Sequence, residues 1–235
     1  MQKYLLAAGL LATAMSLSIA KPAVALSFDT GTNTFTVDTS STADVGQSIK
    51  VLFNGFVEET LVSGLTSEAL FTVLGIDTTD NRLDLRVDLT NTSSAPITSS
   101  RVSILGFDLD PNPNSVTSTG IFNSVTSGNP PQTVVGDVEF CFKGGGGPNC
   151  QGGGGAGVTL GNTGAFFPVL SYASLPSSVT FSNFFVRYQD ITGTPLGNSG
   201  VGVGLVPTPA MLPGLIGMGM AALRKREEES AEADS

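Results

Sequence analysis

Two cysteines set among glycines form the segment whose residue types most suggest chemistry. Cys141 and Cys150 are separated by eight residues, and four-glycine runs occupy positions 144–147 and 152–155. Two thiolates in a chain without histidine make a poor metal site, and the spacing is not the two-residue spacing of redox pairs. The glycine runs continue as Ala156-Gly157-Val158, without the Lys-Ser/Thr ending of a phosphate-binding loop. A flexible surface loop that serves as a contact site is the remaining functional interpretation.

A second candidate is a polar turn whose side-chain oxygens are spaced two residues apart. Asp108, Asp110 and Asn112 resemble the start of a calcium-binding loop. The sixth position of such a loop is Pro113 here instead of glycine, and the twelfth is Thr119 instead of an acid. We therefore favour an Asx/Pro turn at a strand end and predict no metal site.

Catalytic chemistry finds little support in the residue types of the chain. The absence of histidine excludes charge-relay triads and histidine-containing zinc sites. Paired carboxylates could serve a glycosidase, but the chain has no tryptophan and only three tyrosines to form a sugar platform. The acids that such a pair would draw on are Glu58, Glu59, Glu68, Asp137 and Glu139. We expect a protein that is not an enzyme and carries no cofactor.

The net charge of the chain bears on which kinds of molecule it can bind. The 235 residues carry a formal net charge of −9 and only 13% charged residues, with a pI near 4.3. An acidic surface disfavours binding to nucleic acid, which requires lysine and arginine for the phosphates. It favours solubility, or contact with divalent cations outside the cell.

The N-terminus has the pattern of a secretory signal peptide. Lys3 precedes an apolar run from Leu5 to Ala20, and Ala23-Val24-Ala25 offers a small-x-small cleavage site. Cleavage after Ala25 predicts an exported chain. In an exported chain two cysteines are expected to pair, so we predict a structural disulfide between Cys141 and Cys150.

The C-terminus has three parts. Pro207-Thr208-Pro209-Ala210 breaks regular structure, an uncharged apolar run extends over 211–223, and Arg224-Lys225-Arg226 forms a basic cluster that would stop transfer across a membrane. Thirteen residues are too short to span a bilayer of about 30 Å as a helix. Upstream residues from Val201 are expected to help, or the segment inserts only transiently into the inner membrane.

These three parts resemble a PEP-CTERM sorting domain, in the Pro-Thr-Pro-Ala variant found in cyanobacteria. The acidic tail over 227–235 departs from the pattern, because many members stop soon after the basic cluster. The resemblance implies processing by signal peptidase and by an exosortase-type enzyme. It also implies delivery to the cell surface, the outer envelope or the exopolysaccharide matrix, with exopolysaccharide as a partner.

The middle of the chain predicts an all-β domain. Residues 82–89 alternate strictly between charged and apolar types, so Leu83, Leu85, Val87 and Leu89 should face a core. Further strands are predicted over 28–37, 48–57, 102–109, 134–142, 166–172 and 179–188, and turns over 91–100, 111–120 and 128–132. Residues 67–74 fit a short helix or a strand.

We therefore predict three regions: a signal peptide helix over 1–25, one β-sandwich or jelly-roll-like domain over 26–205, and a sorting segment with a hydrophobic helix over 206–235. Stretches 64–71, 88–93 and 184–189, together with the cysteine–glycine segment, resemble the cistern family of cyanobacterial PEP-CTERM proteins, which implies no particular activity. The expected function is that of a surface or matrix protein. The alternatives are a carbohydrate- or calcium-binding extracellular module and a carboxylate-dependent hydrolase.

Overall fold

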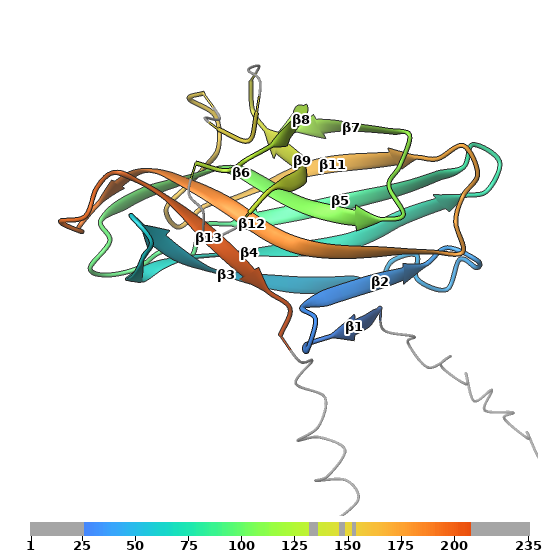
Figure 1. Cartoon of the computed structure of the whole chain (residues 1–235), viewed down its shortest axis with the longest axis horizontal. Helices are drawn as coiled ribbons and strands as arrows, with labels where there is room; N and C mark the ends of the chain where they lie inside the picture. The colour runs from blue at the N-terminus through green and yellow to red at the C-terminus, as the bar shows by residue number, and fades with distance from the viewer. Residues whose placement is uncertain (1–25, 132–135, 146–148, 152–153, 208–235) are drawn as a thin grey trace, which may run out of the picture.

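The computed structural model describes residues 26–131, 136–145, 149–151 and 154–207, and over these residues the protein is all-β, as predicted (Figure 1). The described part contains thirteen strands and no helix. The helices expected at the two ends of the chain fall outside the described residues.

The strands, in chain order, are β1 (Ser27–Asp29), β2 (Thr34–Asp38), β3 (Ser48–Val57), β4 (Thr60–Asp77), β5 (Arg82–Thr90), β6 (Ser99–Asp110), β7 (Ser115–Gly120), β8 (Ser124–Gly128), β9 (Val138–Lys143), β10 (Val158–Thr159), β11 (Thr163–Ser171), β12 (Ser178–Thr192) and β13 (Ser199–Leu205).

All strand pairs are antiparallel and belong to one continuous sheet. Its hydrogen-bonded order is β7-β11-β5-β4-β3-β13-β12-β6-β9-β8, while β2 adds to β12 with β1 beside it and β10 adds to β6. The two end strands of this path, β7 and β8, follow one another in the chain and contact each other. The sheet is therefore nearly closed, with its long strands running along the long axis of the molecule (Figure 1).

The interior of the rolled sheet holds the apolar face of each strand. Leu83, Leu85, Val87 and Leu89 are buried, as the alternation in β5 predicts. Phenylalanine rings from distant strands fill the centre, where the rings of Phe35 in β2, Phe71 in β4 and Phe181 and Phe184 in β12 lie within 4.5–6.3 Å of one another. Aromatic contacts at these distances stabilise a core beyond the area they bury.

The outward face of β5 carries its charges in neighbouring pairs. Arg82 Nε lies 2.9 Å from Asp84 Oδ1, and Arg86 Nη2 lies 2.7 Å from Asp88 Oδ1. These side chains are a quarter to a half exposed, and ion pairs in contact with water contribute little to stability. Because both pairs lie within β5, they keep its outward face charged but do not link it to a neighbouring strand.

Strand β13 bears on one of two alternatives left open by the sequence. Residues from Val201 onward were expected to lengthen the apolar C-terminal run, unless that run inserts only transiently. Residues 199–205 instead form a central strand between β12 and β3, inside the predicted β domain over 26–205. Glycine makes this possible, because a Cβ on Gly202 would lie 2.6 Å from the carbonyl oxygen of Asn54 and 2.9 Å from the Tyr188 ring. The Tyr188 ring of β12 fills the space that a side chain at position 202 would occupy.

Four further segments differ from the predicted pattern or settle an open choice. The stretch 28–37 is two strands, because the carboxylate of Asp29 accepts the backbone N–H of Gly31 at 2.7 Å and turns the chain. The strand expected from Val134 begins at Val138 within the described residues. Residues 115–120, expected in a turn, form β7 at an end of the sheet path, and residues 67–74 lie inside β4.

The turn between β1 and β2 is hydrogen-bonded to the end of the last strand, β13. Asn33, between β1 and β2, donates from Nδ2 to the carbonyl oxygen of Gly204 and accepts the N–H of Val206 at Oδ1, both at 2.6 Å. Val206 and Leu26 are both buried. The two ends of the folded domain are therefore tied into the same structure.

Candidate functional site on the outer face of the sheet

A disulfide fastens the cysteine–glycine loop to the outer face of the sheet. Cys141 in β9 is bonded to Cys150 in the loop, which is the predicted pairing. Both cysteines are fully buried in a small apolar cluster with Ile104, Val138 and Phe185 that is separate from the main core. The described residue Cys150 thus lies packed against the sheet.

A fully buried lysine accompanies the disulfide, and the sequence analysis missed it. Lys143 lies two residues after Cys141 in β9, so its side chain points to the same face as the disulfide. Its Nζ donates to the carbonyl oxygen of Asn149 at 2.8 Å. Burial lowers the pKa of Lys143, because the charged form loses its hydration. The Cys-x-Lys spacing within a predicted strand was the available signal.

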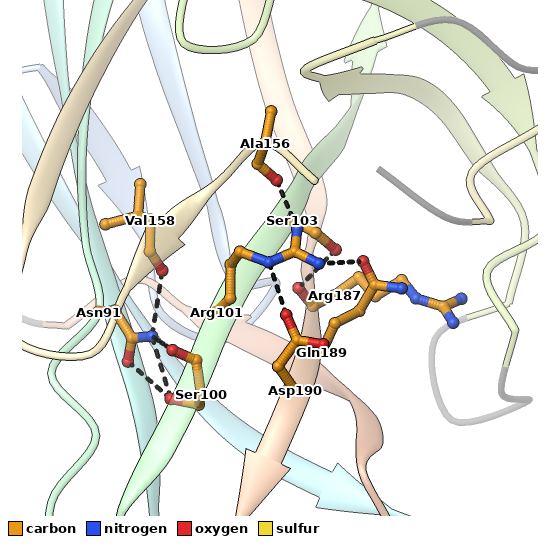
Figure 2. A network of polar contacts seen from close by, with 9 residues as sticks. All are labelled: Asn91, Ser100, Arg101, Ser103, Ala156, Val158, Arg187, Gln189 and Asp190. Carbon is orange, nitrogen blue, oxygen red and sulfur yellow. Dashed lines mark hydrogen bonds and ion pairs between the residues drawn. The ribbon is translucent and has the colours of Figure 1, made fainter. Parts of the chain in front are cut away.

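Arg101 in β6 joins three segments on the same face (Figure 2). Its Nε lies 2.8 Å from Asp190 Oδ2, its Nη1 donates to the carbonyl oxygen of Ala156 at 2.5 Å, and its Nη2 lies 3.4 Å from Gln189 Oε1. The Arg101 side chain is 11% exposed, whereas that of Asp190 is 66% exposed. The arginine therefore holds the end of the cysteine–glycine loop against β12.

Two backbone features place these partners. Asp190 has a left-handed φ of 56° at an irregularity in the pairing of β12 with β6, which redirects its side chain toward Arg101. Gly157 has a φ of 140°, and a Cβ there would collide with the carbonyl oxygen of Val102. Only glycine lets the loop approach β6 this closely.

Asn91 anchors the adjoining β10 segment (Figure 2). Its Nδ2 donates to the carbonyl oxygens of Ser100 and Val158, each at 3.2 Å, and its Oδ1 accepts the N–H of Ser93 at 3.2 Å. Asn91 is fully buried, and a buried amide needs all of these partners. The sequence placed Asn91 in a turn and gave no sign of this bracing role.

Arg187 in β12 lies on the same outer face but is only partly satisfied. Its Nη2 donates to Ser199 Oγ at 3.1 Å, while its Nε and Nη1 are buried without a hydrogen-bond partner. Burial lowers the pKa of Arg187. Figure 2 shows its guanidinium extending away from the Arg101 contacts, so the two arginines do not share partners there.

The predicted calcium-like turn uses its oxygens to join strands. Asp108 accepts the N–H of Glu139 at 2.7 Å and the side-chain amide of Asn183 at 2.9 Å. In return Glu139 accepts the N–H of Leu109 at 3.0 Å and the amide of Asn112 at 3.0 Å. Burial, with a smaller effect of the Glu139 charge, raises the pKa of Asp108.

No group of three or more acidic or cysteine side chains that could hold a metal is present in the described part of the chain. Asp108 and Asn112 come together around Glu139, and in the described part of the chain the Asp110 side chain forms no hydrogen bond with them. Their arrangement closes the end of the β6–β9 ladder through side chains, where backbone pairing stops at Phe107 and Phe140.

The other carboxylates considered for catalysis are dispersed. Glu58 and Glu59 form the tight turn between β3 and β4 with φ values of 49° and 62°. Glu68 pairs with Lys50 at 2.9 Å. Asp137 contributes its carbonyl oxygen to the amide of Asn183 at 2.8 Å.

A shallow hollow of about 290 Å³ lies away from these groups, at one end of the sheet. Its lining includes Leu61, Val62, Pro96, Pro195 and Leu196, with no charged side chain. Such a lining offers apolar contact but little that would orient a polar ligand.

Most residues of the predicted address segments fall outside the described residues. These are Ala23 and Ala25 of the cleavage site, Thr208, Pro209 and Ala210 of the motif, and the basic cluster Arg224, Lys225 and Arg226. Pro207 of the motif is the last described residue. In the described part, no helix is long and apolar enough to cross a membrane.

Comparison of the chain with protein-family models, curated proteins and solved structures found no match.

Proposed function

We propose that this chain is a non-enzymatic protein exported to the cell surface, outer envelope or extracellular matrix, with exopolysaccharide as its surroundings and partner. Its precursor is anchored in the membrane transiently and is processed at both ends by signal peptidase and an exosortase-type enzyme. Within this proposal the β domain is a sandwich- or jelly-roll-like module that acts by contact.

The observation that carries the proposal is the agreement between the limits of the folded domain and the predicted processing sites. The first strand begins at Ser27, and Leu26, which directly follows the proposed cleavage at Ala25, is already buried. The last strand ends at Leu205, and Asn33 holds Val206, directly before the motif that starts at Pro207. Removal of both ends would leave the sheet and its core complete.

The disulfide supports the same destination. Disulfides persist in oxidising compartments outside the cytoplasm, and Cys141 and Cys150 are fully buried. Outside the cytoplasm no reducing system would break this bond, so it can keep the glycine-rich loop attached to the domain.

Intact mass of the protein recovered from the surface of its native host tests this proposal. We expect a mass that lacks residues 1–25 and the segment after the Pro-Thr-Pro-Ala motif, and that rises by two protons on reduction. A species retaining residues 211–235 would overturn the sorting proposal, and one retaining residues 1–25 would overturn cleavage of the signal.

A further inference from the structure

The basic residues of the folded domain divide into two groups by their surroundings. Residues 26–206 contain six lysines and arginines. Three of them form partly exposed pairs with carboxylates on the surface: Lys50 with Glu68, Arg82 with Asp84 and Arg86 with Asp88. The other three are Arg101, Lys143 and Arg187, and all of them lie on the outer face that carries the cysteine–glycine loop. Among these three, Arg101 is also paired with a carboxylate, that of Asp190 at 2.8 Å.

Strand pairing places two members of this second group close together. Ile104 in β6 is the direct partner of Lys143 in β9 on one side and of Arg187 in β12 on the other. Directly paired residues share a face, and two strand spacings separate Lys143 from Arg187 by about 10 Å at the backbone. Arg101 lies farther along β6 and points to the same face. Three basic side chains of this acidic domain therefore lie in one region of its outer face.

Arg187 differs from Arg101 in having no anionic partner among the residues that the structure describes. The guanidinium of Arg101 is engaged by Asp190, Gln189 and a loop carbonyl. That of Arg187 donates to the neutral hydroxyl of Ser199, and two of its nitrogens are shielded from water without a hydrogen-bond partner in the described part of the chain. Shielded N–H groups of a charged side chain are costly to leave unpaired, and oxyanions are the ligands whose geometry suits a guanidinium.

We propose that Arg187 binds an oxyanion, a carboxylate or sulfate group, on the outer face of β6 and β12, with Lys143 adding positive potential nearby. The anion approaches from the side of Nη2, which contacts Ser199 Oγ, because Nε and Nη1 are shielded from water and Arg187 as a whole is only partly buried. The anion can come from a free ion or from an acidic polysaccharide, and both present the same chemistry. This proposal stands independently of the export proposed above.

Nuclear magnetic resonance of the side-chain Nε–H of Arg187 in the full wild-type chain is the direct test. The probes are sodium sulfate, glucuronate and an oligomer of galacturonate. Each probe is added in place of sodium chloride so that the ionic strength stays constant, and a neutral glucan oligomer is the negative control. We expect saturable shifts of the Arg187 signal with the oxyanions and none with the glucan. Absence of a saturable shift with all three oxyanions would overturn the proposal.

Matched variants show whether Arg187 itself is responsible. Arg187→Gln should weaken oxyanion binding at least tenfold. Arg86→Gln, which removes an exposed and paired cation from β5, should leave binding within twofold of the wild type. Equal binding by both variants would refute a site at Arg187. Arg187→Lys keeps the charge and the fold while removing the planar fork, so it should bind more weakly than the wild type; unchanged affinity would also count against the site.

The probes separate the two sources. Galacturonate oligomer binding that is at least tenfold tighter per chain than glucuronate binding supports an acidic polysaccharide as the ligand, because linked groups raise the effective concentration. Equal affinities for sulfate, glucuronate and oligomer support a free oxyanion at the same site.

Discussion

Breaking the Cys141–Cys150 bond should destabilise the domain by about 3 kcal/mol. The bond closes a ring of ten residues, and the chain-entropy model gives about 3 kcal/mol for a ring of that size. Reduction cuts the covalent link inside the small buried cluster that the two cysteines form with Ile104 and Phe185, which is separate from the main core. The main core keeps its packing, and most of the loss comes from the greater freedom of the unfolded chain.

Urea unfolding of the oxidised and reduced protein measures this difference. We expect the free energy of unfolding to fall by about 3 kcal/mol on reduction, while the double variant Cys141→Ala, Cys150→Ala should not respond to the reductant. Because the unfolded chain becomes less compact, the dependence on urea should stay the same or steepen slightly. Reduction that changes the free energy by less than about 0.5 kcal/mol, the range of a neutral surface change, would refute the reasoning.

The same perturbation should reach Lys143. Its ammonium is held by the carbonyl oxygen of Asn149, the residue before Cys150. When the loop is released, water should reach Lys143 and its lowered pKa should rise toward the ordinary value. A titration of the Lys143 side chain by nuclear magnetic resonance checks this. An unchanged titration in the reduced protein would mean that the disulfide does not hold the loop over the lysine.

Three further substitutions test other parts of the structure. The raised pKa of Asp108 means that its contribution to stability is present below its ordinary pKa of 3.8 and is lost as pH rises through the higher folded value. The stability of the wild type relative to Asp108→Asn should therefore fall as the pH rises above about 3.8, as thermal unfolding across pH would show; a constant difference would contradict it. Glu59→Gly should stabilise the protein by about 1 kcal/mol, because Glu58 and Glu59 both occupy left-handed conformations in a two-residue turn, and an unchanged urea midpoint would count against this. Gly202→Ala should destabilise by about 2 kcal/mol or more through overpacking, and an unaltered melting temperature would show that β13 can shift to make room.

Local patterns made much of the sheet predictable. Strand β5 alternates apolar and polar residues over its full length, and the predicted limits of β3 and β5 agree with the structure to within a residue. Strand β13 was missed because glycines occupy its inward positions, so the valines that alternate with them do not mark a side that faces the core. Its place in the sheet depends on aromatic side chains in β12 that lie close in space but not in sequence.

The candidate site, like the sheet, was only partly predictable from the sequence. The pairing of Cys141 with Cys150 was predictable, because the two residues are near in sequence and the chain appeared to be exported. The contact of Arg101 with Asp190 spans 89 positions and depends on a β-bulge that redirects the acid. No local pattern contains that information, since register and bulges are set by the whole sheet.

The distribution of basic residues limits the kind of partner that this domain can hold. Lys50, Arg82 and Arg86 are paired at a surface where water screens them, so an approaching anion would have to displace a carboxylate and gain little. Arg187 has no carboxylate to displace, and its shielded nitrogens make an added oxyanion more favourable there than at an exposed arginine. Because an acidic domain repels polyanions over most of its surface, we expect such a ligand to bind where Arg187 lies, on the outer face of β12 and β6.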